Sequence, residues 1–154
     1  MSSEPDSRKP IYPPAFLLMA FVLMMALHLL APVRQLLVSP YRYLGLIPLA
    51  AGVVLVLSVA KMFDHAGTTI RPFQSSTSLI LRGPYRVTRN PIYLGMVIAL
   101  MGIGMLLGSA TPFLVVPAFA LLIDRRFIRA EETILERTFG AEYAGYKGRV
   151  RRWL

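Results

Sequence analysis

Three long stretches of this sequence contain no lysine, arginine, aspartate or glutamate, and they constrain the fold more than any other feature. They cover residues 10–33, 43–60 and 90–123. An apolar run of about 18 or more residues is a candidate transmembrane helix. The first two runs therefore predict one transmembrane helix each, over residues 14–33 and 43–62.

The third uncharged run is too long for a single span. One helix over residues 90–123 would measure about 50 Å, whereas the hydrocarbon core of a bilayer is about 30 Å thick. The sequence GSATP at residues 108–112 supplies a turn signal near its middle. We therefore expect a helical hairpin over residues 92–123. The predicted fold class is an all-α, polytopic membrane protein with about four transmembrane helices, the last two forming this hairpin.

Composition agrees with a membrane protein. Of the 154 residues, 55% are hydrophobic and only 16% are charged, which is too apolar for an ordinary soluble domain. The length predicts one domain, residues 1–154. Cysteine is absent, which excludes a disulfide framework and thiolate chemistry. Residues 1–13 are a polar arm, and the apolar run after them indicates a retained helix rather than a cleaved signal peptide.

The net charge of +9 is unevenly distributed. In the predicted topology, segments 63–91 and 124–154 lie on one side of the membrane and carry most of the basic residues. The other side has only Arg34 and Arg42. The positive-inside rule places the two basic segments and both termini in the cytoplasm. We expect a protein of the bacterial inner membrane whose partner is the lipid bilayer and not nucleic acid.

The tail after the third run has its own pattern. Apolar residues recur at helical spacing up to residue 139, and Gly140 is a suitable C-cap. We predict an amphipathic cytoplasmic helix over residues 124–139 that continues the fourth span out of the bilayer. The basic, aromatic end beyond it suits the membrane interface.

The stretch GPYRVTRNPIY, residues 83–93, leads into the third run. Asn90 fits the N-cap of a helix, and Pro91 fits its first position. Backbone N–H groups at this helix start, with Arg86 and Arg89 alongside, make a candidate anion site. A positively charged flank before a capped helix is the simpler explanation, and this motif alone does not decide between the two.

Two adjacent carboxylates, Glu131 and Glu132, form a second candidate. Neighbouring helix positions point about 100° apart, so one carboxylate can face the membrane domain while the other faces water or an arginine. The inward one could bind a cationic ligand, and a solvated acidic pair is the simpler alternative. His28 and His65 are too few for a metal site. The hydroxyl-rich segment 67–79 contains no Ser-His-Asp arrangement, so no metal and no serine nucleophile are expected.

In this order and spacing, the motifs resemble the isoprenylcysteine carboxyl methyltransferase family of integral membrane enzymes, which is similar to the phospholipid methyltransferases. The family pattern is a hydroxyl-rich loop, Gly-x-Tyr, Arg-His-Pro-x-Tyr opening a transmembrane hairpin, Glu-Glu, and Phe-Gly-x-x-Tyr-x-x-Tyr. The match covers about residues 67–153. The matching positions are Thr77 to Ile80, Gly83 to Tyr85, Arg89 to Tyr93, Glu131, Glu132, Phe139, Gly140, Tyr143 and Tyr146.

The resemblance implies S-adenosylmethionine as the methyl donor and cofactor. Helix-end N–H groups and arginine suit its α-carboxylate, Glu131 suits its ammonium, and aromatic rings suit its adenine or sulfonium. The resemblance implies catalytic roles for Arg89, Asn90 and Glu131. The residues it assigns to cofactor binding are Thr77, Ser78, Leu79, Ile80, Tyr85, Asn90, Pro91, Tyr93 and Glu131.

Two positions depart from the family pattern. Asn90 stands where the family has histidine, and asparagine cannot act as a base near neutral pH. A carboxylate nucleophile needs no base, so Asn90 favours carboxyl transfer over amine or thiol transfer. Phe127 stands where some relatives have a substrate-binding arginine. Arg126 and Arg129 are the candidates for that contact.

The sequence therefore predicts a membrane methyltransferase that uses S-adenosylmethionine. The leading hypothesis is carboxyl O-methylation of an isoprenylcysteine-like, prenylated or other amphiphilic substrate. One alternative is N- or S-methylation of a lipid or small amphiphile. Another is a small four-helix transporter without methyltransferase activity, which would need an ionisable group within the spans, where the sequence offers only His28.

Overall fold

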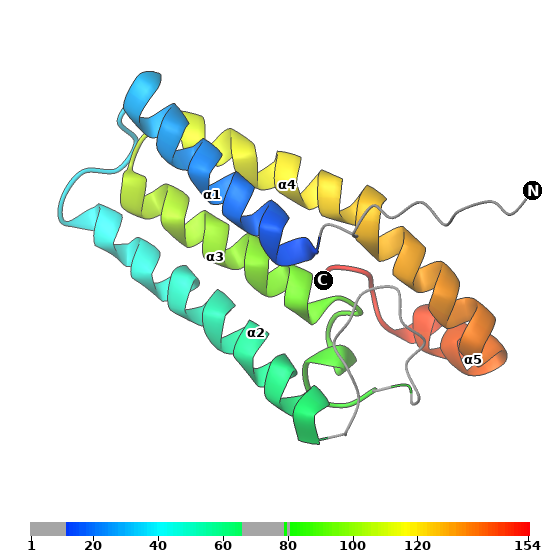
Figure 1. Cartoon of the computed structure of the whole chain (residues 1–154). Coiled ribbons are helices and arrows are strands. Elements are labelled where there is room, and N and C mark those ends of the chain that lie inside the picture. Colours follow the sequence, from blue (N-terminus) through cyan, green and yellow to red (C-terminus); the bar gives the residue numbers. More distant parts are fainter. Residues whose placement is uncertain (1–11, 66–78, 80) are drawn as a thin grey trace, which may run out of the picture.

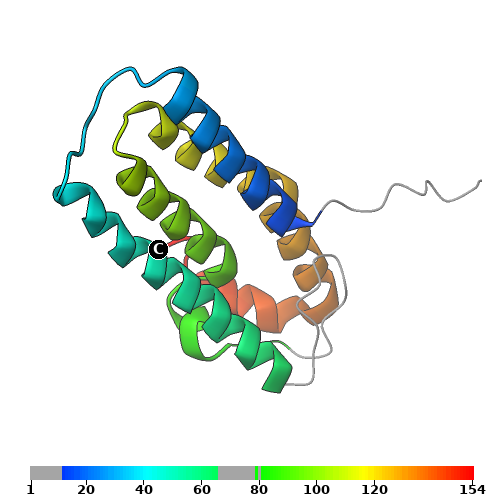
Figure 2. The same cartoon turned by 60° about the vertical axis from the view of Figure 1, so that its left-hand side comes forward.

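The computed structural model describes residues 12–65, 79 and 81–154. Within these ranges the chain is helical and contains no strand, which confirms the expected all-α class. The α-helices are α1 (Pro13–Leu30), α2 (Leu46–His65), α3 (Pro91–Leu107), α4 (Val115–Ile123) and α5 (Arg129–Arg149). Helices α1 to α4 run alternately up and down, and α3 lies between α2 on one side and α1 and α4 on the other (Figures 1 and 2).

Two helical stretches are long and apolar enough to cross a bilayer. They are α1 and the stretch Tyr41–His65, in which a 3₁₀ turn at Tyr41–Gly45 leads into α2. Helix α3 is apolar but has only 17 residues, and α4 has nine. Four complete spans therefore stay a prediction.

Helix α4 does not end at the charged residues that follow it. The chain passes through a π-helical turn at Asp124–Ile128 and continues directly as α5. A π turn widens the helix locally and is frequent at functional sites. The expectation that the tail helix continues the fourth apolar segment is confirmed.

The two connecting loops at one end of the bundle bind each other. The backbone N–H groups of Leu36 and Leu37 donate to the Gly108 carbonyl at 2.7 and 3.0 Å, and Ala110 N–H donates to the Arg34 carbonyl at 2.8 Å. Gly108 ends α3 in the left-handed conformation, with φ 78°, which glycine adopts without steric penalty. The predicted hairpin turn is confirmed.

Helices α2 and α3 pack with their backbones in close contact. A Cβ atom on Gly52 would lie 2.4 Å from the Gly95 carbonyl oxygen, and one on Gly102 would lie 2.6 Å from the Gly45 carbonyl oxygen. Gly45, at the end of the 3₁₀ turn that leads into α2, and Gly52 of α2 are seven residues apart, as are Gly95 and Gly102 of α3, so each pair faces the other. Small residues at such crossings allow close van der Waals packing where lipid gives no hydrophobic drive between helices.

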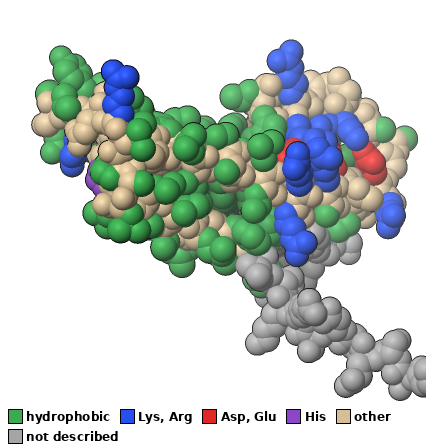
Figure 3. All heavy atoms as spheres, turned by 90° about the horizontal axis from the view of Figure 1, so that it is seen from above, with side chains coloured by type: hydrophobic (Ala, Val, Ile, Leu, Met, Phe, Trp, Pro, Cys, Tyr) green, Lys and Arg blue, Asp and Glu red, His purple; other side chains and the backbone are tan. Residues whose placement is uncertain are grey.

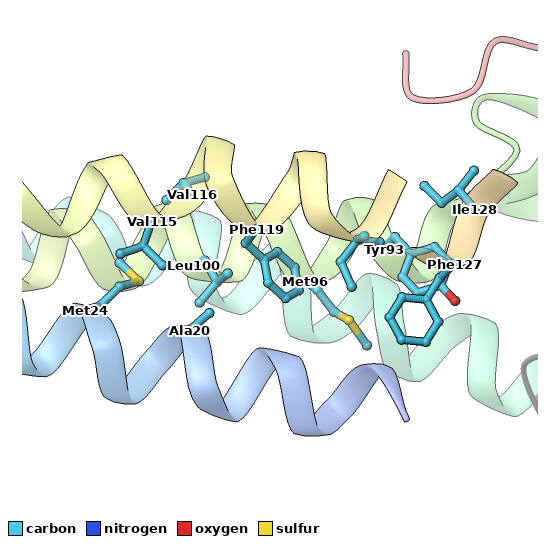
Figure 4. Close-up of a cluster of buried hydrophobic side chains, with 11 residues drawn as sticks. Ala20, Met24, Tyr93, Met96, Leu100, Val115, Val116, Phe119, Phe127 and Ile128 are labelled. Carbon is cyan, nitrogen blue, oxygen red and sulfur yellow. The ribbon is translucent and has the colours of Figure 1, made fainter. Parts of the chain in front are cut away.

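A second packing layer joins α1, α3 and α4. Figure 4 shows Met24 and Ala20 of α1 lying against Leu100 of α3 and Phe119 of α4. At one end of this cluster, Tyr93 of α3 lies beside Phe127 of the π turn. The apolar core therefore reaches the end of the bundle at which α5 begins.

The outer surface carries apolar side chains in the middle and charges at the ends. In Figure 3 a largely hydrophobic band separates basic side chains at the two ends of this face. On α1 and α2, large apolar side chains such as Leu18, Val22, Ile47 and Val54 are exposed. An apolar surface of this kind suits contact with lipid.

The tail departs from prediction at Gly140. The helical chain does not stop there but kinks, with Gly140 at φ 50° and ψ −120°, and then continues to Arg149. Glycine allows this left-handed backbone at little cost. The kink turns the chain back toward the start of α3 (red in Figure 1), where Tyr143 and Tyr146 become buried. An end at residue 139 was therefore wrong, because burial of these tyrosines favours a second helical segment.

Candidate functional site

A hydrogen bond between α3 and α5 marks the centre of the candidate site. The Tyr93 hydroxyl donates to Oε1 of Glu131 at 2.6 Å. Tyr93 lies in the first turn of α3, and Glu131 lies in the first turn of α5. Two residues that are 38 positions apart in sequence are thus brought together at the charged end of the bundle.

The adjacent carboxylates have different surroundings, as their helical geometry predicted. Glu132 is buried and pairs with Arg89 at 3.1 Å and with Arg152 at 2.7 Å. Glu131 faces Tyr93, and within the described part of the chain no lysine, arginine or histidine pairs with it. Glu132 is therefore a structural ion-pair residue, whereas the charge of Glu131 is available to a ligand.

Aromatic rings surround this part of the molecule. The Tyr93 and Phe127 ring centroids are 6.4 Å apart, and Phe127 meets Phe16 of α1 edge-on at 5.3 Å. The ring centroids of Tyr85 and of Phe63 in α2 are 6.1 Å apart. A carboxylate beside aromatic faces is a chemical setting that attracts organic cations.

The environment alters the protonation of Glu131. Burial raises the pKa of this carboxyl from 4.5 to about 7, and the hydrogen bond from Tyr93 opposes part of the rise. Burial, followed by the charge of Glu131, raises the pKa of Tyr85 above its ordinary value. The Tyr85 hydroxyl therefore stays protonated, and Glu131 titrates near neutral pH. A perturbed carboxyl in such a place is characteristic of functional sites.

Tyr85 is held in position by the second segment of α5. The Tyr146 hydroxyl donates to the Tyr85 carbonyl at 2.7 Å. Tyr85 itself lies in a 3₁₀ turn, Gly83–Arg86, in which Gly83 has φ 61°. The resemblance included both tyrosines, but only the fold shows that one anchors the other.

Asn90 and Arg89 do not have the surroundings that the sequence predicted. Asn90 makes no side-chain cap on α3; its Nδ2 donates to the Arg152 carbonyl at 3.0 Å, and its own N–H donates to Oγ1 of Thr88. Asn90 occupies the N-cap position and Pro91 the first helical position, as predicted, but the Asn90 side chain binds the carbonyl of the returning tail instead of a backbone N–H of α3. Arg89 forms a buried ion pair with Glu132. Its charge is therefore already compensated, which argues against the predicted role of Arg89 in binding an anion.

The other predicted residues are distributed as follows. Pro91 is buried at the first position of α3, as expected, and Leu79 is partly buried. Arg126 is exposed, and Arg129 is exposed and pairs with Asp124 at 3.1 Å. Thr77, Ser78 and Ile80 lie outside the described residues.

Sequence reasoning missed Arg152 and Thr88. Arg152 binds Glu132 and Asp124 with its side chain, and its carbonyl accepts hydrogen bonds from Thr88 and Asn90. The sequence pattern of the basic end indicates only a membrane-interface segment. No local pattern distinguishes Arg152 from its neighbour Arg151, so only the fold could identify it.

The structure thus combines apolar helices with a carboxylate, Glu131, that lies beside tyrosines at the charged end and has no cationic partner in the described part of the chain. A model of the phospholipid methyltransferase family matches residues 41–142. The chain belongs to this family, as the resemblance of its motifs indicated. Membership identifies a methyltransferase that is associated with membranes.

A protein of Haemophilus influenzae described as uncharacterized is 43% identical to this chain over 63 residues. The aligned part is 41% of this chain and all of the relative. No solved structure matches the chain.

Proposed function

We propose that the protein is a membrane-embedded methyltransferase that binds S-adenosylmethionine with Glu131, Tyr93 and Tyr85. One observation carries the proposal, namely that Glu131 is a largely desolvated carboxylate with no cationic partner among the described residues. The cofactor has an α-ammonium and a sulfonium, and these match a carboxylate flanked by aromatic rings. When bound, the cofactor supplies an electrophilic methyl group.

The residues of the site hold the cofactor in position or exclude water from it, and none acts as an acid or a base in the reaction. The ionised Glu131 binds the ammonium, while Tyr93 orients the carboxylate through its hydrogen bond. Tyr85, kept in its protonated form, provides a neutral aromatic face. The apolar residues beneath the site, such as Phe127, exclude water. Positioning and exclusion of water are sufficient when the acceptor is already nucleophilic.

The preferred acceptor is a carboxylate on an amphiphile. Asn90 replaces the family histidine, and its side-chain amide binds the tail, so it offers no base to deprotonate an amine or thiol. The exposed Arg126 and Arg129 are proposed to bind an anionic head group at the membrane surface. N- or S-methylation of a lipid or small amphiphile is the alternative.

The charged end is proposed to face the cytoplasm of a bacterial cell, with α1 to α4 in the inner membrane. Most basic side chains lie at the α5 end, and Arg34 and Arg42 lie at the other. Because the chain has no cysteine, single cysteines can report this directly. In intact spheroplasts, a membrane-impermeant maleimide should label Val38→Cys and not Glu142→Cys. Inverted vesicles should give the opposite pattern, and equal labelling from both sides would exclude the proposed orientation.

Calorimetric titration of S-adenosylmethionine into protein in lipid nanodiscs tests the cofactor site. At pH 8 we expect saturable binding to wild type and binding about 100-fold weaker to Glu131→Gln, because removing one partner of a desolvated charge pair costs about 2–5 kcal/mol. Glu136→Gln is the matched control, because Glu136 is exposed and pairs with Lys147 on the surface. The control should bind as wild type does.

The pH dependence gives a second arm of the same titration. The Glu131 pKa of about 7 in the free protein means that the carboxyl is protonated at pH 5.5, so affinity should rise with pH through 7. Glu131→Gln should lack this rise. Equal affinities of wild type and Glu131→Gln would reject the site assignment. Absence of binding to folded wild type in nanodiscs would reject the cofactor.

A further inference from the structure

The chain leaves α5 at Val150 in an extended conformation, with φ −122° and ψ 131°. The five residues 150–154, here named the C-terminal strap, run along the segment that precedes α3. Arg89 N–H donates to the Arg151 carbonyl at 3.0 Å. The Arg152 carbonyl accepts from Thr88 Oγ1 at 3.1 Å and from Asn90 Nδ2 at 3.0 Å. Three consecutive residues, 88–90, are thus tied to the strap.

The side chain of Arg152 binds α5 and the π turn. Its guanidinium donates from Nε and one terminal nitrogen to the two carboxylate oxygens of Glu132, at 3.1 and 2.7 Å. Its remaining nitrogen donates to Asp124 of the π turn at 3.2 Å. This fork geometry requires arginine, because lysine offers a point charge and no planar pair of donors. Trp153 then packs against the apolar core.

These contacts involve a near neighbour in sequence of each partner in the Tyr93–Glu131 hydrogen bond. Asn90 precedes Tyr93 by three residues, and Glu132 is adjacent to Glu131 in sequence. One residue of the strap therefore connects the start of α3 with the first turn of α5. Residues 143–154 lie beyond the segment that matches the family model, so the strap is a feature of this chain outside that match.

We propose that the C-terminal strap is a positioning element of the cofactor site, with Arg152 as its principal residue. Arg152 touches neither Glu131 nor Tyr93 in any of its described contacts and acts through Asn90 and Glu132. This gives Asn90 a positioning role as well, since its amide nitrogen holds the strap. The proposal rests on the proposed function for its effect on cofactor binding, while the ordering of the two helix starts does not depend on it.

The test compares Arg152→Ala with Arg151→Ala. Each variant removes one positive charge from the strap, and both keep the backbone carbonyls that accept hydrogen bonds from residues 88–90. The side chain of Arg151 is exposed. We expect S-adenosylmethionine to bind Arg152→Ala about 10- to 100-fold more weakly, because small displacements of positioned groups have effects of this size. Arg151→Ala should bind as wild type does, and Arg152→Lys should fall between them.

Two further readouts separate positioning from general destabilisation. The Tyr93 hydrogen bond lowers the pKa of Glu131, so misalignment in Arg152→Ala should move the pH midpoint of cofactor binding upward. A variant that is merely less folded would keep the wild-type midpoint. Amide hydrogen exchange of the cofactor-free protein should be faster in the first turns of α3 and α5 in Arg152→Ala alone.

These outcomes decide the proposal independently of the proposed function. Equal binding, pH midpoint and exchange in Arg152→Ala and Arg151→Ala would overturn the role of the strap. If wild type binds no S-adenosylmethionine, the proposed function fails, and the exchange measurement still decides whether Arg152 orders the two helix starts.

Discussion

Replacing Glu132 with glutamine is expected to destabilise the protein by about 3–5 kcal/mol, because breaking a buried ion pair leaves an uncompensated charge. The side chains of Arg89 and Glu132 are only 8% and 7% exposed. The Nε atom of Arg89 is buried and has no hydrogen-bond partner among the described residues, so this guanidinium depends strongly on the carboxylate. The free energy of unfolding can be measured by denaturant titration in detergent micelles.

Glu136→Gln is the control for this prediction. Glu136 and Lys147 form a surface pair whose side chains are 44% and 41% exposed, and such pairs contribute about 0–1 kcal/mol. The double variant Arg89→Met/Glu132→Leu should be more stable than Glu132→Gln, because it removes both charges of the pair together. If Glu132→Gln and Glu136→Gln proved equally mild, the buried ion pair would not be a stabilising requirement of this fold.

Replacing Gly52 with alanine should also destabilise the protein, by about 1–3 kcal/mol, as overpacking does. The new Cβ would lie 2.4 Å from the Gly95 carbonyl oxygen and 2.6 Å from the Ala99 nitrogen. Both are backbone atoms of α3, so the two helices would have to separate. Alanine is otherwise the better helix former by about 1 kcal/mol, which makes a loss of stability specific evidence for the close crossing.

The same substitution at Gly145 is the matched control. Gly145 lies within α5, and a Cβ atom there would meet nothing within 4 Å. Gly145→Ala should therefore raise stability slightly or leave it unchanged. The melting temperature of the two variants, recorded in the same detergent, gives the comparison. A melting temperature for Gly52→Ala at or above the wild-type value would show that α2 and α3 do not cross as described.

Most of the helices could be predicted from the sequence because charge-free runs and turn residues are local signals. The hairpin is an example, since Gly108 is needed at a left-handed position that ends α3. The second half of α5 was not predicted, because local signals do not show whether a helix continues past a glycine. A glycine at position 140 is consistent with either a helix end or a kink, and the outcome depended on burial of Tyr143 and Tyr146 against distant residues.

The site was predictable in part. The different surroundings of Glu131 and Glu132 followed from their 100° separation on a helix. Helix geometry alone did not say which one faces inward, and only the family resemblance singled out Glu131. The environment of Asn90 was mispredicted, because its cap position is a local property whereas its partner, the Arg152 carbonyl, lies 62 positions away.

By itself, the sequence determined the helical class, the position of the charged end and the motif order that identifies the family. Each of these depends on spacing along the chain, which a one-dimensional pattern records completely. Only the tertiary structure decided that Glu132 pairs with Arg89 and Arg152, while Glu131 accepts a hydrogen bond from Tyr93 and has no cationic partner among the described residues. It also decided that the C-terminal strap lies along the start of α3. The physical reason is that pairing and desolvation depend on distances across the fold, and the arginines of the basic end carry no local mark of which one will pair with Glu132.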